Sequence, residues 1–526
     1  MPCGSVGFEK QGVALAVPGP CSGSSMKILW TQGRPCPPFS FCALSALITA
    51  ALVSGCGGGS SSMSMPGSGM GTVAVSISDP PSCKDPNGSF EHVYLTARSV
   101  QAHIDPNARD SSSGWQELAP QLANQPMQID LFSAPQTNCI LAQLGSASLP
   151  VGSYQQIRLL LVSNTPGASD AVPSTNACAG NGYNCVVLND GSVHELELSS
   201  QANTGLKIPP GQIAGGPIQV SAGQSVDLNI DFNACASIVQ EGNGKFRLKP
   251  TLTAGQVSPN NSGIGGQVVD SVTKAPIAGT VLVAAEMPDS TGTDRIVMET
   301  ATDANGNFRF CPLPSGTFDI VIVGVGPNNL PYNATSIVNV PNGTNLNAIP
   351  LVAEVGASSP AVLQGVVTAS TSSGGASVDV SLSALQNISF NSGMAVSRQL
   401  TIPLQSIPAT PTSPAIASTG LVSTATNTAC PAGSPANANC SIYTLVVPAS
   451  NPSVAVFSSS GFSYAAPPPG SVFFTVDAIA ALPMSGGVSD CSPSELSTSK
   501  DVNNQPLQVT AGTTTSVARI DFAGCF

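Results

Sequence analysis

The side chains best suited to catalysis or metal binding are few in this chain and lie far apart. The histidines are His92, His103 and His194, and none belongs to an H-E-x-x-H motif or lies near a C-x-x-C pair. Protein zinc sites are usually built from such closely spaced ligands. The sequence therefore predicts no metal site, and it places His92 and His103 on the solvated face of one strand region.

Two acidic patterns also deserve comparison with known chemistry. Glu195 and Glu197 in "HELEL" would lie roughly 6.6 Å apart on one strand face, a spacing compatible with glycoside hydrolysis but far commoner on a solvated face. "DANGN", Asp303–Asn307, resembles the start of a calcium loop, yet the twelfth-position Glu is missing. A hairpin turn at Asn305-Gly306 explains it better. With no G-x-S-x-G motif either, we expect no catalytic residue, no cofactor and no enzymatic activity.

The composition indicates which elements carry these residues. Of 526 residues only 9% are charged, while Gly (52) and Pro (45) are frequent and hydrophobic residues make up 42%. Many short strands and turns with real hydrophobic cores are expected, and the length suits about three domains. We predict an all-β protein of three tandem β-sandwich domains. The net charge of −12 and the absence of a Lys/Arg cluster argue against nucleic-acid binding.

The N-terminal region has the pattern of a processing signal. The apolar run from Phe41 to Val53 is about 13 residues, too short for a membrane span of roughly 20 but suited to a secretory signal. Val53-Ser54-Gly55-Cys56 resembles the lipobox of bacterial lipoproteins, which implies acylation of Cys56; a core strand ending at a structural cysteine is the alternative. Residues 1–55 are then an N-terminal extension plus a signal peptide (26–55) starting at Met26, and residues 56–70 are the lipidated cysteine and a Gly/Ser tether. Gly57 after the cysteine favours, by this resemblance, the outer membrane.

The remaining cysteines predict disulfides. Five of the 15 cysteines lie at or before Cys56, which leaves 15 − 5 = 10, an even number in an exported protein. Cys178 and Cys185 flank a short polar turn, and so do Cys430 and Cys440. Cys491 and Cys525 are then the two remaining cysteines of the C-terminal domain, and we expect them to pair. The pairing of Cys83, Cys139, Cys235 and Cys311 stays open.

The first domain, 71–255, contains several strand patterns. In "HVYLTARSVQAHI" the apolar alternation slips by one between Ala97 and Val100, which predicts a β-bulge. The ordered segments "SDPPS", "HVYLTARSVQAHI", "LPVGSYQQIRLLL", "TGLKIP", "VDLNIDFNACASI" and "FRLKPTL" resemble the bacterial lipoprotein domain of unknown function 4382. The resemblance implies an exported β-sandwich and supplies no catalytic residues.

The second domain, 262–355, contains "GGQVVDSVTKAPIAGTVLVA" and "TATDANGNFRFCPLPSGTFDIVIVG". These segments resemble the carboxypeptidase regulatory-like domain, a small prealbumin-like sandwich. Phe308 and Phe310 should share one face, and Phe318, Ile320 and Ile322 should share a face of the next strand. Gly316-Thr317-Phe318 stands where that family usually has G-x-Y. No counterpart of a catalytic zinc domain accompanies it.

The third domain, 360–526, ends in a segment similar to one in the first. "QVTAGTTTSVARIDFAGC" aligns with "QVSAGQSVDLNIDFNAC" (219–235) after one inserted residue. We interpret this as a weak internal repeat, although two unrelated strands of common pattern are the alternative. A repeat places Val517, Ile520 and Phe522 in the core, with a bulge near 516–519, and turns Asp521 outward.

These patterns predict a non-enzymatic, lipid-anchored protein of the bacterial cell envelope, held at the membrane through its acyl chains. A binding or adhesion module is the favoured function, with a glycan or an envelope protein as partner; a structural accessory or spacer of an outer-membrane assembly is the alternative. A surface groove with exposed aromatic residues would discriminate between them, because sugar sites use stacked aromatic rings. The only tryptophans are Trp30 and Trp115, a scarcity that counts against strong glycan binding.

Overall fold

The computed structural model describes the chain in segments. These are residues 69–79, 90–109, 111–133, 139–198, 205–240, 244–248, 252–257, 263–289, 291–354, 356, 359–391, 395–409, 411–412, 415–424, 430–435, 437–459, 461–465, 467–483 and 491–525. Cys56, the signal peptide, Cys83 and residues 56–68 of the tether lie outside them, so those expectations remain predictions. The expected end of the tether at residue 70 is wrong by one residue, because Met70 already belongs to strand β1 (Met70–Ser78).

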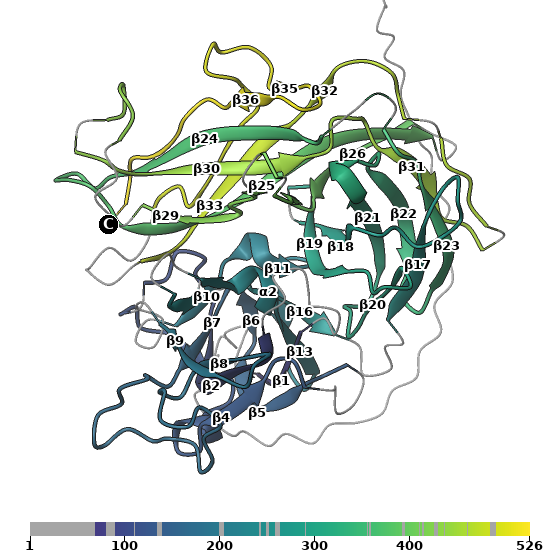
Figure 1. Cartoon of the computed structure of the whole chain (residues 1–526). Helices are drawn as coiled ribbons and strands as arrows, with labels where there is room; N and C mark the ends of the chain where they lie inside the picture. The colour runs from purple at the N-terminus through teal and green to yellow at the C-terminus, as the bar shows by residue number, and fades with distance from the viewer. Residues whose placement is uncertain are drawn as a thin grey trace, which may run out of the picture. The chain divides into compact units, whose positions relative to one another are not determined.

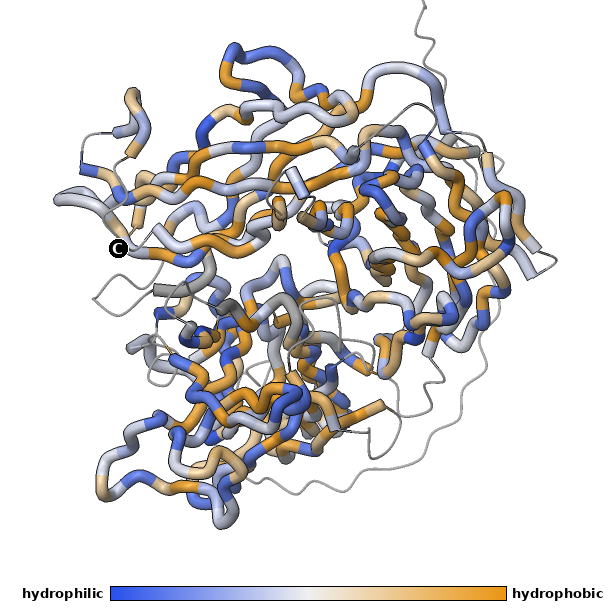
Figure 2. The backbone as a smooth tube through the Cα atoms, in the orientation of Figure 1, coloured by the Kyte–Doolittle hydropathy of each residue, from blue (hydrophilic) through white to orange (hydrophobic). Residues whose placement is uncertain are grey.

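The described residues form an almost entirely β structure (Figure 1), which confirms the predicted fold class. The single α-helix among them is α2 (Ala234–Ser237), and the 3-10 turns are η1 (Pro120–Ala123), η2 (Pro210–Gln212) and η3 (Pro327–Asn329). Figure 2 shows apolar residues recurring along the strands of each region. Within the described segments, no helix has the length and apolar character needed to cross a membrane.

The first region, 69–257, is built on two main sheets. In order across each sheet, the first contains β11 (Ile213–Ala214), β16 (Leu252–Val257), β13 (Ser225–Phe232), β1 (Met70–Ser78) and β5 (Ala142–Pro150). The second contains β10 (Leu206–Ile208), β7 (Gln156–Leu161), β2 (Phe90–His103), β8 (Cys185–Leu188), β9 (Val193–Glu197), β15 (Phe246–Leu248) and β14 (Ile238–Gln240), with β3 (Gln116–Glu117) and β4 (Met127–Asp130) beside β2. The short pair β6 (Gly152–Tyr154) and β12 (Ile218–Val220) is separate.

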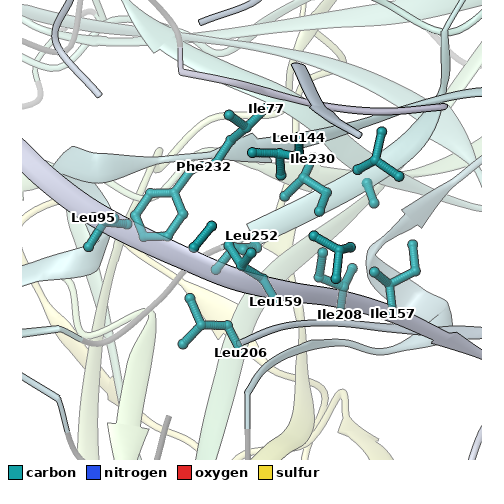
Figure 3. Close-up of a cluster of buried hydrophobic side chains, with 14 of the residues drawn as sticks. Ile77, Leu95, Leu144, Ile157, Leu159, Leu206, Ile208, Ile230, Phe232 and Leu252 are labelled. Atoms are coloured by element: carbon teal, nitrogen blue, oxygen red, sulfur yellow. The ribbon is translucent and has the colours of Figure 1, made fainter. Parts of the chain in front are cut away.

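One hydrophobic core joins these two sheets. Figure 3 shows Ile77 and Ile230 of the first sheet in the same cluster as Leu95, Ile157 and Leu159 of the second. Strand β2 runs through the cluster, and its pairing with β7 shifts register between Ala97 and Ser99. This shift confirms the predicted bulge. It lets residues on both sides of the slip keep their apolar side chains in the core.

The second region combines a three-stranded sheet with part of a much larger one. The small sheet has the order β20 (Asn307–Phe310), β17 (Ile264–Asp270), β23 (Asn345–Leu351). The larger sheet contains β22 (Thr335–Pro341), β21 (Thr317–Val325), β18 (Thr280–Pro288) and β19 (Thr293–Ala301). The two predicted apolar faces are buried in one core, which contains Phe308, Phe310, Phe318, Ile320 and Ile322.

The large sheet continues into the third region. Strand β19 pairs in parallel with β26 (Ala395–Ile402), and β22 pairs in parallel with β31 (Ser453–Val456). From β26 the sheet extends through β25 (Val378–Asn391), β33 (Thr475–Pro483) and β34 (Glu495–Thr498), with β29 (Leu421–Ser423) beside β25. The sheet therefore continues across the expected boundary between 262–355 and 360–526. The physical reason is that β19 and β22 each have an edge of unpaired backbone groups, which strands of the third region pair with.

The opening and closing strands of the third region pair as they do in the first. Strand β24 (Ala361–Ala369) pairs with β30 (Asn439–Val447) and, in parallel, with β36 (Thr514–Ser516) and β37 (Ile520–Phe522), as β1 pairs in parallel with β13. Thr514 lies opposite Val362 and Ile520 lies opposite Val367, so the closing strand advances six residues while β24 advances five. That extra residue lies where the inserted residue predicted a bulge. The short pairs β27 (Ser406–Ile407) with β28 (Ile416–Ala417), and β32 (Val472–Phe473) with β35 (Gln508–Val509), complete the region.

Core positions of the closing strand follow the predicted repeat. Val517, Ile520 and Phe522 are all buried in the third region's core, as Val226, Ile230 and Phe232 are in the first. Asp521 points away from that core but is only half exposed. This agrees with the expected outward orientation, and the carboxylate accepts hydrogen bonds from Thr368 Oγ1 (2.7 Å) and Arg519 Nε (2.6 Å).

Candidate functional site

The three histidines are used in separate local contacts. His92 Nδ1 lies 2.7 Å from Asp130 Oδ2, and His194 Nε2 lies 3.0 Å from Ser192 Oγ. His103 is buried, because its ring packs against Trp115 at 5.1 Å and its Nδ1 accepts the backbone N–H of Asp105. Its expected place on a solvated face is therefore wrong. Within the described segments, no three His, Cys, Asp or Glu side chains are grouped to hold a metal ion.

The Glu195 and Glu197 carboxylates each have a different partner. Asn164 Nδ2 donates to Glu195 Oε1 at 3.0 Å, and Lys245 Nζ forms an ion pair with Glu197. Both side chains remain at the surface as expected. This arrangement gives each carboxylate a structural contact.

The Asp303 carboxylate stabilises its turn by accepting hydrogen bonds from backbone amides. Its Oδ1 accepts the N–H groups of Asn305 and Asn307, both at 2.8 Å, and Gly306 adopts a positive φ of 76°. The bonds lower the pKa of Asp303, with the Asn307 amide first among the causes. The predicted turn is present, but the strands on its two sides do not pair with each other, so the predicted hairpin is wrong. Asn305 lacks the positive φ of a type I′ turn, and the flanking strands β19 and β20 belong to different sheets.

The same turn occurs twice more among the described residues. Asp289 Oδ1 accepts the N–H groups of Thr291 (2.7 Å) and Thr293 (3.1 Å), with Gly292 at φ 86°. Asp501 Oδ1 accepts those of Asn503 and Gln505, both at 2.8 Å, with Asn504 at φ 61°. The shared pattern is Asp, then Gly or Asn three residues later, because that position needs a left-handed backbone. This signal is visible in the sequence, and it identifies all three as structural turns.

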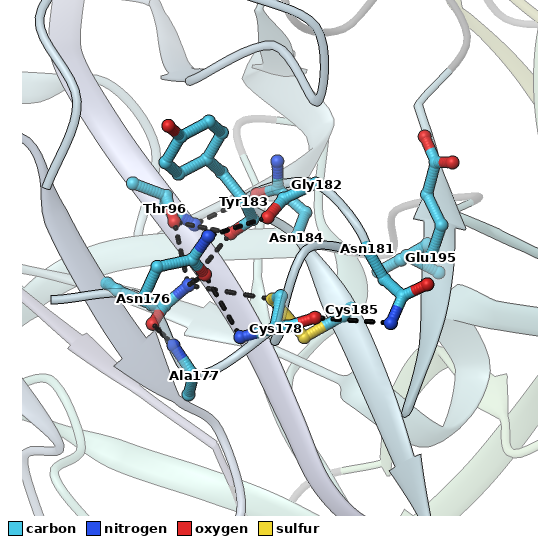
Figure 4. Close-up of a disulfide and its surroundings, with 12 residues drawn as sticks. Thr96, Asn176, Ala177, Cys178, Asn181, Gly182, Tyr183, Asn184, Cys185 and Glu195 are labelled. Atoms are coloured by element: carbon cyan, nitrogen blue, oxygen red, sulfur yellow. Dashed lines mark hydrogen bonds between the residues drawn. A yellow bond between two sulfur atoms is a disulfide. The ribbon is translucent and has the colours of Figure 1, made fainter. Parts of the chain in front are cut away.

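Three cysteine pairs are disulfides of the kind that the spacing predicts. Cα–Cα distances are 5.7 Å for Cys178–Cys185, 5.6 Å for Cys430–Cys440 and 3.8 Å for Cys491–Cys525. Around the first pair (Figure 4), Asn176 Oδ1 accepts the Cys178 N–H and Cys178 O accepts the Asn181 N–H. The disulfide therefore closes a loop that its own hydrogen bonds already shape.

A fourth disulfide joins Cys139 to Cys311, a pairing that the sequence left open. Their Cα atoms are 5.4 Å apart, although 172 positions separate them in the chain. Cys139 precedes β5 of the first region and Cys311 follows β20 of the second. The bond therefore links the first two regions covalently. Sequence spacing carries no information about a contact of such long range.

An ion cluster around the buried Arg295 connects the second and third regions, and its Glu495 member is exposed. Arg295 of β19 donates to Asp289 Oδ2 (3.0 Å), to Asp477 Oδ2 of β33 (2.5 Å) and to Glu495 Oε1 of β34 (2.5 Å). Burial raises the pKa of Asp477 to about 6, even though the charge of Arg295 acts to lower it. The cluster orients the strands and leaves none of these groups free for chemistry.

A second buried polar set lies between β1 and β13. Ser78 Oγ donates to Asp231 Oδ1 at 2.9 Å, and Asn229 Nδ2 donates to Ser78 Oγ at 2.7 Å. Burial raises the pKa of Asp231 to about 7, while the Ser78 bond acts to lower it. A carboxyl group with this environment carries a proton over much of the range in which an ordinary aspartate is ionised.

One surface hollow combines apolar and polar side chains. It has a volume of about 230 Å³ and lies in the third region. Its walls are Leu385, Asn387, Phe473, Phe474, Thr475, Ser499, Lys500, Pro506 and Leu507. Phe473 is 47% exposed. Sequence analysis missed this group, although the adjacent Phe473 and Phe474 were a signal, since strand alternation sends neighbouring side chains to opposite faces.

Trp115, the tryptophan expected to test a sugar site, has a different environment. The Arg158 guanidinium carbon lies 4.0 Å from its ring centroid, and its Nε1 donates to the Arg109 carbonyl at 2.9 Å. The ring is only half-exposed. Its faces are thus used by the cationic and histidine side chains around it.

A comparison with known protein families gives a match for the first region of the chain. The family described as domain of unknown function DUF4382 matches residues 70–250, the region where the resemblance was seen. No curated protein matches the chain. Neither the prealbumin-like resemblance of 262–355 nor the lipobox is tested by these comparisons.

Several solved structures show a distant similarity to this chain. The Bacillus anthracis TIE protein has 9% identity and a TM-score of 0.14, and the match covers 87% of this chain and 51% of that one. A streptococcal ancillary pilin has 10% identity and a TM-score of 0.15, covering 82% and 94%. A double mutant of the shaft pilin SpaA from Lactobacillus rhamnosus GG has 9% identity and a TM-score of 0.16, covering 54% and 97%. TM-scores this low carry no argument about function.

Proposed function

We propose that this chain is a non-enzymatic binding or adhesion module of the bacterial cell envelope. The observation that carries the proposal is the set of four disulfides among the described residues. Disulfides form and persist in oxidising compartments such as the periplasm and the cell surface. The histidines and surface carboxylates considered above act in structural contacts, which further supports a binding role over catalysis.

A carbohydrate is the proposed ligand class. The hollow around Phe473 supports it, since a partly exposed aromatic ring among polar side chains is what a sugar requires. The decisive experiment applies the purified, oxidised protein to a glycan array. Saturable binding to a defined group of glycans is expected, and an array without signal would rule out the carbohydrate class.

Attachment to the outer membrane through Cys56 is part of the same proposal. Cys56→Ala should abolish acylation, because no other residue of the lipobox offers a thiol. The measurement is incorporation of radiolabelled palmitate in the native cell, with Cys42→Ala as the matched control that keeps its label. Label retained in the Cys56 variant would contradict the lipoprotein assignment.

A spacer in an outer-membrane assembly is the second candidate. The sheet that runs without interruption from the second region into the third favours it, because continuous backbone pairing resists bending between the two. Proximity labelling in the native cell tests this candidate. An envelope protein labelled equally well by a variant unable to bind glycans would favour the spacer.

A further inference from the structure

Phe473 is an aromatic side chain that the core does not use. In β32 and the residue after it, Val472 and Phe474 are buried while Phe473 is 47% exposed. This is the expected alternation of a strand with one face packed. The half-exposed ring, in a protein with only 5% aromatic residues, leaves an aromatic surface that a ligand can contact.

The wall of the hollow is built on paired backbone. Leu385 lies opposite Thr475 in the β25–β33 pairing, and Asn387 lies two residues further along β25. On the other side, the Phe474 N–H donates to the Leu507 carbonyl at 3.0 Å, and the Leu507 N–H donates to the Ser499 carbonyl at 2.8 Å. Side chains placed on such paired elements need little ordering when a ligand binds.

The hairpin from Ser499 to Leu507 is held by its own turn. Lys500 pairs with Pro506, and the Asp501 N–H donates to the Gln505 carbonyl at 2.9 Å. The Asp501 carboxylate is occupied by the turn amides described above. Lys500 therefore projects from a fixed turn and not from a long flexible loop.

Four polar side chains around Phe473 have unused hydrogen-bonding capacity. Within the described part of the chain, the side chains of Asn387, Thr475, Ser499 and Lys500 form no hydrogen bond or ion pair, and those of Asn387, Ser499 and Lys500 are exposed. An amide, two hydroxyls and an ammonium offer several donors and three acceptors. This combination matches the hydroxyl groups of a sugar. The lysine adds a positive charge that favours an anion, although the neighbouring Asp501 carboxylate, whose pKa the Lys500 charge helps to lower, offsets part of it.

We propose that this hollow binds a single uronic-acid ring, a pyranose bearing a carboxylate, which deepens and rests on the proposed carbohydrate-binding function. The C–H face of the ring packs on Phe473, the hydroxyls bond to Asn387 and Ser499, and the carboxylate pairs with the Lys500 ammonium. The volume of about 230 Å³ lies below the roughly 300–1,000 Å³ of drug-sized pockets, which limits the site to one ring. Charge complementarity selects the acid over the neutral sugar.

The test compares D-glucuronate with D-glucose on the full-length, oxidised protein, using saturation-transfer NMR titrations. Glucuronate should bind at least about tenfold more tightly than glucose at low salt, with weakening as salt is added. Phe473→Ala should reduce the affinity for both sugars at least about tenfold. Lys500→Gln should abolish the preference for glucuronate and leave glucose binding unchanged.

Matched controls separate the site from general surface effects. Ile442→Ala removes an apolar side chain that is 49% exposed elsewhere, and Lys274→Gln removes an exposed lysine in another region; neither should change either affinity. Equal binding of the two sugars, or full glucuronate affinity in Phe473→Ala, would overturn the assignment. If the protein binds glycans on the array and the Phe473 and Lys500 variants bind them equally well, this site is wrong while the carbohydrate-binding function is supported. If the array shows no binding, both proposals are wrong.

Discussion

Two carboxyl groups, the buried Asp231 and the half-exposed Asp521, accept hydrogen bonds whose strength depends on pH. Asp231 accepts from Ser78 inside the first region, and Asp521 accepts from Thr368 and Arg519 at the edge of the third. Burial dominates the first group and raises its pKa. At the second, burial also acts to raise the pKa, but the bonds from Arg519 and Thr368 outweigh it and lower the pKa.

Asp231→Asn should remove part of the pH dependence of stability. With a folded pKa of about 7 and an unfolded value near 3.9, the folded state keeps a proton that the unfolded state has released. Stability of the native protein should therefore fall between about pH 4 and 7, by at most about 1.4 kcal/mol per pH unit from this group. The variant keeps an acceptor oxygen for Ser78 but cannot ionise.

Urea unfolding at several pH values between 4 and 8 measures this effect. The variant should be more stable than the native protein at pH 8 and closest to it at pH 4. Burial also raises the pKa of Asp79, so part of the decrease in stability with rising pH should remain in both proteins. Parallel stability curves for the two proteins would contradict the expectation.

Alanine substitutions at two adjacent residues of the closing strand should reduce the free energy of unfolding by different amounts. Phe522→Ala should lower the free energy of unfolding by about 3–5 kcal/mol, because the ring is fully buried. Asp521→Ala should cost about 1–2 kcal/mol, since it leaves Thr368 and Arg519 without their acceptor. This second cost should disappear as the pH falls through the lowered pKa of Asp521. Denaturant midpoints at pH 7 and at successively lower pH check both expectations, and equal costs for the two variants at pH 7 would refute the assigned orientations.

At the scale of elements, local patterns predicted strands and irregularities but not their partners. The phase slip at Ala97–Val100 identified the bulge in β2, because a strand must keep its apolar face in the core. The inserted residue near Ser516 likewise located the extra residue in the closing strand. In contrast, the turn at Asn305-Gly306 gave no sign that β19 pairs with β18 and β26 instead of β20. Partner choice depends on long-range packing, which a short window does not contain.

The Phe473 hollow shows the same limit. Alternation along "SVFFTV" indicates that one of the two phenylalanines faces outward. The sequence does not indicate that residues 499–507 fold back beside it.

The Cys178–Cys185 loop offers a test at this scale. Replacing both cysteines by serine should lower the free energy of unfolding by about 2–3 kcal/mol, because an open loop gains conformational entropy in the unfolded state. Denaturant unfolding of the variant, with the native protein as control, gives the difference. A loss far below about 1 kcal/mol would mean that the hydrogen bonds of Asn176 and Asn181 alone fix the loop.

At the scale of the whole molecule, long-range bonds join regions that the sequence divides into domains. The Arg295 cluster connects β19 with β33 and β34, and the Cys139–Cys311 disulfide connects the first two regions. The second and third regions also share one sheet. Because of the shared sheet and the Arg295 cluster, we expect the second and third regions to unfold together.

Arg295→Gln should weaken that cooperation. The substitution leaves the buried Asp477 without its counter-charge, a loss of about 3–5 kcal/mol for a broken buried ion pair. Differential scanning calorimetry should show a lower melting temperature and a broader transition. Lys274→Gln, at an exposed lysine, serves as the control and should leave the melting profile unchanged. An unaltered profile in the Arg295 variant would show that the shared sheet alone joins the regions.

The Cys139–Cys311 bond also determines how the protein would respond to a pulling force. A protein tethered to a cell and bound to a surface carries tension along its covalent chain. Because this disulfide bridges 172 positions, tension entering before Cys139 passes directly to Cys311 and bypasses the chain between them. That segment would otherwise extend by roughly 600 Å when fully stretched. The first region after Cys139 and about half of the second region, up to Cys311, are thereby protected from mechanical unfolding, and only a reductant would release that length of chain.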